Sequence, residues 1–161
     1  MSVTIASDQV RTIALGIKVN RATATLPQTA TGSIFTVTGG RVVLAAILGE
    51  VTTVLGATAT NLNLVHTPTV GTVGDLCAAT VCTSDSVGTL YSITGVPADL
   101  MSAEKVGGTV VPVDYNAGIP PRQLILPVGN LGLKASANNT GSVKWSIVYI
   151  PFDNGASVVA A

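Results

Sequence analysis

β-Branched residues, interrupted at short intervals by glycine and proline, constrain this chain more than any other feature. Val, Thr and Ile number 23, 21 and 10, which is a third of the 161 residues. Such side chains lose rotamer freedom in helices and pack well on a pleated surface. Turn-forming residues recur about every ten positions, at Pro27, Gly32, Gly39, Gly56, Pro68, Gly74, Gly88 and Pro97. This spacing is typical of a sandwich or barrel of short strands.

Alternation of apolar and polar residues places the strands within this pattern. In the clearest case, apolar residues occupy every second position from Val143 to Tyr149, and Pro151 ends the strand. A turn over residues 138–141 predicts a hairpin between this strand and residues 131–135. The apolar run from Arg41 to Leu55 predicts a strand buried on both faces. We expect further strands over residues 13–19, 31–38, 61–64, 76–83, 89–94, 109–114 and 123–126, and one short helical turn over residues 97–105.

These elements amount to about ten short strands and almost no helix. No linker and no repeat of fixed period divides the sequence, so we expect residues 1–161 to form a single domain. Two stacked sheets fit the pattern best. The predicted fold class is therefore all-β: an antiparallel β-sandwich, jelly-roll-like, with extended termini. The termini are an N-terminal arm over residues 1–10 and a C-terminal tail over residues 153–161.

Charge is scarce, and this excludes several classes of protein. Only 10% of the residues are Asp, Glu, Lys or Arg, and eight basic residues balance eight acidic ones. Eight scattered cations cannot form a large nucleic-acid-binding patch. The longest apolar run, Val42–Leu48, is too short for a membrane span of about 20 residues. Because a net charge near zero promotes association, we expect neighbouring chains, not nucleic acid or membrane, to cover much of the surface.

Residues that carry out chemistry are few and form no recognisable motif. His66 is the only histidine and stands at a predicted strand end, so we expect a surface or turn position. Most aspartates lie beside turn residues, where their usual role is to accept hydrogen bonds from nearby backbone amides. Cys77 and Cys82 are expected to be small buried thiols. We therefore predict no enzyme activity, no catalytic residue, no cofactor and no metal ion.

Two segments of the sequence resemble structural proteins of tailed bacteriophages. The N-terminal segment Val3–Gln9 is similar to openings of such proteins, and Gly141–Pro151 looks like the closing strand of small β-rich virion proteins. The composition, rich in Thr, Ala, Val and Gly, resembles that of capsid decoration (cement) proteins. The resemblance implies a non-enzymatic protein on the capsid exterior that coats the shell of major capsid protein. It also implies a homo-oligomer, with a trimer favoured.

Within this interpretation, three regions are predicted to contact partners. The arm Ser2–Val10 could add as a strand to a neighbouring sheet edge. The loop Val96–Pro121 is long enough to reach a partner, and the tail Asp153–Ala161 is small and apolar enough to lie in a groove. The candidate interface residues are Val3, Ile5, Asp8, Leu100, Met101, Tyr115, Ile119, Val158 and Val159.

Two alternative functions stay open at this stage. One is a different component of a phage particle, such as a tail subunit, a head-fibre subunit or a shell protein. The other is a carbohydrate-binding β-sandwich module that stacks sugars on Trp145, Tyr149, Tyr91 or Tyr115. For Trp145 and Tyr149 we favour the simpler interpretation that they are the largest side chains of the core, because aromatic residues make up only 4% of the chain.

Overall fold

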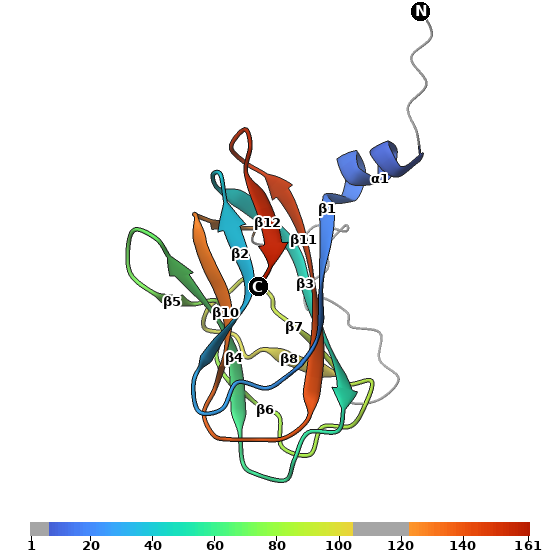
Figure 1. Cartoon of the computed structure of the whole chain (residues 1–161), viewed down its shortest axis with the longest axis vertical. Coiled ribbons are helices and arrows are strands. Elements are labelled where there is room, and N and C mark those ends of the chain that lie inside the picture. Colours follow the sequence, from blue (N-terminus) through green and yellow to red (C-terminus); the bar gives the residue numbers. More distant parts are fainter. Residues whose placement is uncertain (1–6, 105–122) are drawn as a thin grey trace, which may run out of the picture.

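Two antiparallel sheets packed face to face form the protein (Figure 1). The computed structural model describes residues 7–104 and 123–161. The elements are α1 (Ser7–Leu15), β1 (Ile17–Thr25), β2 (Thr31–Thr38), β3 (Val42–Thr53), β4 (Asn61–Pro68), β5 (Gly74–Asp75), β6 (Thr80–Val81), β7 (Leu90–Ser92), β8 (Ser102–Glu104), β9 (Leu124–Leu126), β10 (Gly129–Ala135), β11 (Ser142–Pro151) and β12 (Ser157–Ala160). The predicted antiparallel β-sandwich is confirmed.

The order of the strands is that of a jelly roll. One sheet, sheet A, has the order β1-β11-β3-β7-β8, with β9 also paired to β3. The other, sheet B, has the order β12-β2-β10-β4-β5, with β6 also paired to β4. The chain alternates between the sheets from β1 to β4. It then returns with β10 between β2 and β4 and with β11 between β1 and β3.

Alternating side chains fill the space between the sheets. Along β11, Val143, Trp145, Ile147 and Tyr149 are all buried, as the sequence predicts for core residues. Leu62 and Leu64 on β4 and Leu131 on β10 are buried on the side of sheet B. Burial of these apolar side chains, at roughly 25 cal/mol per Å² removed from water, is the main force that holds the two sheets together.

The predicted hairpin between residues 131–135 and the last strand is wrong. β10 belongs to sheet B and β11 to sheet A, so the turn between them crosses from one sheet to the other. The side chain of Asn139 fixes this crossing, because its buried amide donates to the carbonyls of Gly56 and Thr58 and to the hydroxyl of Thr60. These hydrogen bonds join the β10–β11 turn to the loop at residues 56–60, rather than joining two strands of one hairpin.

The prediction that residues 41–55 are buried on both faces is also wrong. β3 covers Val42–Thr53 and alternates along its length, with Val42, Leu44, Ile47 and Val51 buried. Its other face is half-buried or exposed, although it carries apolar residues as well. The continuous apolar run therefore reflects one core face and one apolar outer face.

Secondary structure occurs in the described part of both predicted termini. Residues 7–15 form α1, which ends at Gly16, a residue with φ of 92° whose amide donates to the Thr12 carbonyl. A glycine in this left-handed conformation is a common end of a helix. The C-terminal tail contains β12, which pairs with β2 from Thr38 to Phe35. The tail is therefore a strand of sheet B.

The other predicted strands differ in their bounds. The strand predicted over residues 13–19 begins only at Ile17, because residues 13–15 belong to α1, and the strand predicted over residues 61–64 continues to Pro68. Within residues 76–83 only Thr80–Val81 is a strand, and within residues 89–94 only Leu90–Ser92. The predicted helical turn over residues 97–105 is wrong, because Ser102–Glu104 is a strand, β8, that pairs with β7. The predicted strand over residues 109–114 lies outside the described residues.

Candidate interaction surfaces

Two of the predicted interface residues are buried and unavailable to a partner. Met101, directly before β8, is only 1% exposed and packs in the core, and its amide donates to the Ala78 carbonyl. Val158 is buried because β12 alternates, and the next residue, Val159, points outward and is exposed. Leu100, by contrast, is exposed. Met101 and Val158 are therefore core residues rather than interface residues.

The other predicted interface residues lie at the edge of the described structure or beyond it. Asp8 belongs to α1, so residues 7–10 do not form the extended arm that the sequence suggested. Val3 and Ile5 fall in residues 1–6, and Tyr115 and Ile119 in residues 105–122, both outside the described residues.

A helix that stands away from the sandwich is the first surface that the sequence reasoning missed. Figure 1 shows α1 leaving the start of β1 and projecting beyond the two sheets. Val10 and Leu15 on this nine-residue helix are exposed, Leu15 by 64%. Isolated helices shorter than about 12 residues are marginal in water. Exposed apolar residues on such a short helix favour a contact with another chain. The glycine at position 16 was the signal that could have predicted a helix end here.

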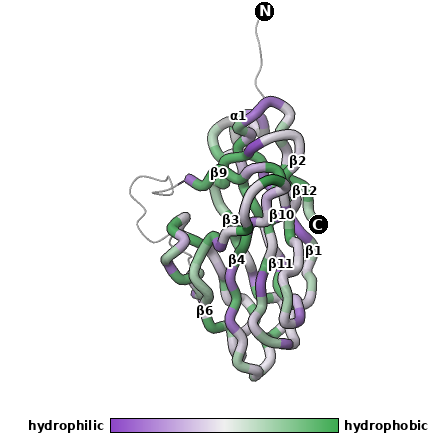
Figure 2. The backbone as a smooth tube through the Cα atoms, turned by 90° about the vertical axis from the view of Figure 1, so that its left-hand side faces the viewer, coloured by the Kyte–Doolittle hydropathy of each residue, from purple (hydrophilic) through white to green (hydrophobic). Residues whose placement is uncertain are grey.

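A row of apolar side chains crosses the outer face of sheet A. Ile150 on β11 is opposite Val43 on β3, and Val43 is opposite Ile125 on β9. Ile150 and Ile125 are 41% and 51% exposed. Figure 2 shows the hydrophobic stretch of tube at β9. We call Ile150, Val43 and Ile125 the outer apolar row. Further along β3, Leu48 is another exposed apolar residue.

Charges border this face but do not break the row. Lys144 on β11 and Glu50 on β3 are cross-strand neighbours and form a salt bridge of 2.8 Å on the far part of the sheet. Next to Ile150, the guanidinium of Arg41 lies 4.8 Å from the ring centre of the exposed Phe152. Arg41 is also paired with Asp153, so its charge is compensated within the chain.

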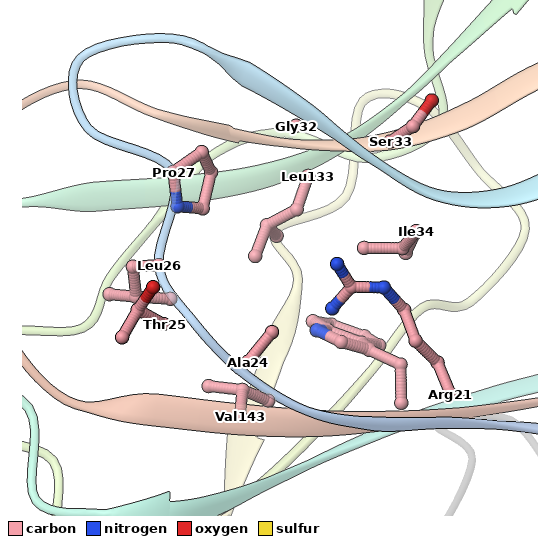
Figure 3. A pocket seen from close by; sticks show the side chains of 11 residues that line it. Arg21, Ala24, Thr25, Leu26, Pro27, Gly32, Ser33, Ile34, Leu133 and Val143 are labelled. Carbon is pink, nitrogen blue, oxygen red and sulfur yellow. The ribbon is translucent and has the colours of Figure 1, made fainter. Parts of the chain in front are cut away.

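A small cleft of about 190 Å³ opens between the two sheets at the side of β1 and β2 (Figure 3). Its floor is apolar and buried, formed by Leu26, Ile34, Leu133, Val143 and Trp145. The rest of the lining comes from Arg21, Ala24, Thr25, Pro27, Gly32 and Ser33. The Arg21 side chain reaches from β1 toward Ile34, and Leu26 and Pro27 lie at the opposite end (Figure 3).

Two irregularities of the sandwich produce this cleft. The register of β1 against β11 shifts between Arg21 and Ala24, and both residues line the cleft. β12 pairs only with residues 35–38 of β2, and beyond it the Ala161 amide donates to the Ile34 carbonyl. Within the described chain, residues 31–33 of β2 have strand partners on the β10 side alone. The other side of this stretch faces the cleft.

Arg21 provides hydrogen-bond donors at the mouth of the cleft. It is opposite Trp145 in the register of β1 and β11 and is half-buried. Its Nε donates to the Ala161 carbonyl at 3.0 Å. A guanidinium carries five N–H groups, so most of its donors remain for a carbonyl or carboxylate of a bound group.

His66 is buried, and the predicted surface position is wrong. It lies in phase with the core residues Leu62 and Leu64 on β4 and is 5% exposed. Burial lowers the pKa of the imidazole, which a hydrogen bond to the Pro127 carbonyl raises to a smaller extent. Nε2 has no hydrogen-bond partner among the described residues. A neutral imidazole enclosed in the core has no path to a substrate.

The side chains of two aspartates bind other side chains: Asp85 binds Tyr91, six residues away, and Asp153 binds Arg41 from a distant segment. The buried Asp85 accepts a hydrogen bond of 2.6 Å from the Tyr91 hydroxyl. Burial, together with this neighbour, raises the pKa of Tyr91 far above its ordinary value. Asp153 accepts hydrogen bonds from both the backbone and the guanidinium of Arg41, which lower its pKa to about 2. Both pairs connect segments of the sandwich and serve its structure.

The cysteines and aromatic residues also belong to the core. Cys77 and Cys82 are buried, as predicted. Tyr91, Trp145 and Tyr149 are buried, and the rings of Tyr91 and Trp145 stack with centroids 6.4 Å apart. These three side chains are therefore not exposed as a sugar-stacking platform. Tyr115 lies outside the described residues.

Comparisons with known proteins identified no relative of this chain. Searches found no matching protein family, curated protein or solved structure. Among the described residues, no three His, Cys, Asp or Glu side chains gather as a metal site. None of the helices in that same part of the chain is long and apolar enough to cross a membrane.

Proposed function

We propose that this chain is a non-enzymatic structural protein of a phage particle. In this role it decorates the capsid exterior and stabilises the shell by binding the major capsid protein and further copies of itself. The outer apolar row is the observation that carries the proposal. An exposed apolar surface that spans three strands of one sheet is typical of a surface that another protein covers.

Charge distribution supports the same role. Two salt bridges within the chain lie near the outer face: Lys144 pairs with Glu50, and Arg41 pairs with Asp153. A surface with compensated charges and exposed apolar side chains binds mainly through apolar and backbone contacts. The net charge of zero, which promotes association, is compatible with a chain that functions inside an assembly.

The resemblance of Val3–Gln9 and Gly141–Pro151 to virion proteins supports a phage particle as that assembly. A decoration protein binds at many equivalent positions on a shell, often as a trimer around a symmetry axis. A tail or head-fibre subunit would share the sandwich and the apolar surfaces but would occur in few copies per particle. Copy number therefore separates these two roles.

A binding experiment with two matched variants tests the proposal. Purified protein is mixed with undecorated capsids, and the bound fraction is measured by sedimentation. Ile125→Asp places a charge in the outer apolar row, whereas Val81→Asp places the same charge on an exposed position of β6 in sheet B. The proposal expects binding by the wild type and by Val81→Asp, and strongly reduced binding by Ile125→Asp. Absence of wild-type binding contradicts the proposed function.

A further inference from the structure

The cleft between β1 and β2 has the size and chemistry of a receptor for one aliphatic side chain of an extended peptide. An engineered apolar cavity of about 150 Å³ is large enough to take up benzene. The cleft, at about 190 Å³, therefore has room for a Val or Ile side chain on its floor of Leu26, Ile34 and Trp145. Arg21 at the mouth can donate to a peptide carbonyl.

The open stretch of β2 provides the backbone contacts that such a peptide needs. Residues 31–33 pair with β10 on one side, and their other side continues the line in which β12 pairs with residues 35–38. An extended segment that follows this line adds a strand to sheet B and directs alternate side chains into the space between the sheets. The cleft lies at this position.

The N-terminal residues of the chain have the matching pattern. Val3 and Ile5 are separated by Thr4, so both side chains point to the same side when the segment is extended. β-Branched residues with this alternation favour strands. We propose that residues 2–6 of one copy bind as a strand beside residues 31–33 of a second copy, with Ile5 in the cleft. This inference rests on the proposed role as a self-associating structural protein.

Distances along the chain exclude binding of the segment to its own cleft. Val3 and Ile5 are four and two residues from Ser7, so an extended chain carries them at most about 14 and 7 Å from the helix. α1 is about 13 Å long, and Arg21 lies about 13 Å along β1 from Ile17. α1 does not fold back along β1 (Figure 1). Even if α1 and β1 met at a right angle, Ser7 would lie about 18 Å from Arg21, which is farther than the extended segment can carry Val3.

The exchange gives each copy one donated segment and one occupied cleft. Such a contact is heterologous, because the surfaces on the two partners differ, and it closes into a ring when the rotation between copies allows it. A trimer, as the resemblance implies, is one ring of this kind. α1 is then the spacer that carries residues 2–6 out to the neighbouring copy.

Cross-linking between two differently labelled chains tests the exchange directly. One chain carries Ile5→Cys and the other Ala24→Cys, which lines the cleft; they are mixed and oxidised. The native cysteines are buried and do not compete. We expect a disulfide-linked heterodimer. In the control, Ala22→Cys replaces Ala24→Cys, because Ala22 is exposed on β1 and outside the cleft lining. Equal cross-linking with both partners, or none with Ala24→Cys, overturns the inference.

Association measured by sedimentation velocity provides a second, independent readout. Ile5→Asp is expected to weaken self-association roughly 10- to 100-fold, because a charge replaces a side chain that would be buried. Thr4→Asp adds the same charge on the opposite side of the strand and is expected to keep most of the association. Equal effects of the two variants overturn the inference. Far-UV circular dichroism of each variant verifies that the sandwich is folded.

The two proposals fail separately. If the chain binds capsids but no Ile5–Ala24 cross-link forms, the exchange is wrong and the proposed function stands. If the cross-link forms but capsids are not bound, the exchange is right and the proposed function is wrong.

Discussion

A methyl group added at Gly49 is expected to destabilise the core behind the cleft. On the inner face of sheet A, Gly49 lies between Trp145 on β11 and Tyr91 on β7, and the absence of a side chain lets the two rings stack over it. A Cβ at this position would lie 2.7–2.9 Å from three carbons of the Trp145 ring. The indole is buried and stacks with the buried ring of Tyr91, so it cannot move without displacing neighbours. Overpacking of this kind costs about 1–3 kcal/mol.

Gly74→Ala is the matched control for Gly49→Ala. A Cβ at Gly74 meets no atom within 4 Å, and this residue is exposed at β5. There we expect no loss of stability, and up to about 1 kcal/mol of gain from the reduced entropy of the unfolded chain. Urea unfolding followed by the fluorescence of the single Trp compares the variants. Gly49→Ala should also melt about 2–12 °C below the wild type. Equal midpoints for Gly49→Ala and Gly74→Ala would refute the packing argument.

Three further predictions concern the titratable side chains. Because burial lowers the pKa of His66 below 6.5, the unfolded state binds its proton first as the pH falls. The free energy of unfolding should then decrease below pH 6.5 by up to about 1.4 kcal/mol per pH unit, until the pH reaches the folded-state pKa. His66→Gln should flatten this slope in urea titrations at several pH values. An NMR titration should give Asp153 a pKa of about 2, and Arg41→Gln should return this pKa toward 3.8. The stabilisation that the Arg41–Asp153 pair gives to the folded state is complete above pH 3.8 and is lost as the pH falls through about 2. Cys77 and Cys82 are expected to resist a thiol reagent in the folded protein and to react in denaturant, and rapid labelling of the folded protein would contradict their burial.

The sandwich could be predicted because burial on one side of a strand requires apolar residues at every second position, and this alternation is visible in the sequence. β11 shows this most clearly, since Val143, Trp145, Ile147 and Tyr149 occupy every second position and all four face the core. The same reasoning could have found His66, which lies in phase with Leu62 and Leu64. Its place at a predicted strand end suggested the surface, but β4 continues to Pro68 and His66 is buried within it.

The outer face and the cleft could not be predicted, because they depend on pairings between distant segments. An apolar run such as that in β3 looks the same whether its second face is covered within the chain or exposed to a partner. The hairpin error has a similar cause, because the contacts of Asn139 with the loop at Gly56 decide that β10 and β11 lie in different sheets. The cleft follows from a register shift between Arg21 and Ala24, which no local pattern indicates.

Direct counting of the protein on capsids tests the central claim most directly. Undecorated shells are saturated with purified chain and imaged, and the number of bound copies is taken from the added density on the outer surface. The proposed function predicts density at regular, symmetry-related positions, with a fixed number of copies per shell and hundreds on each head. Bare shells, together with a chain that remains a stable monomer in solution, would contradict it.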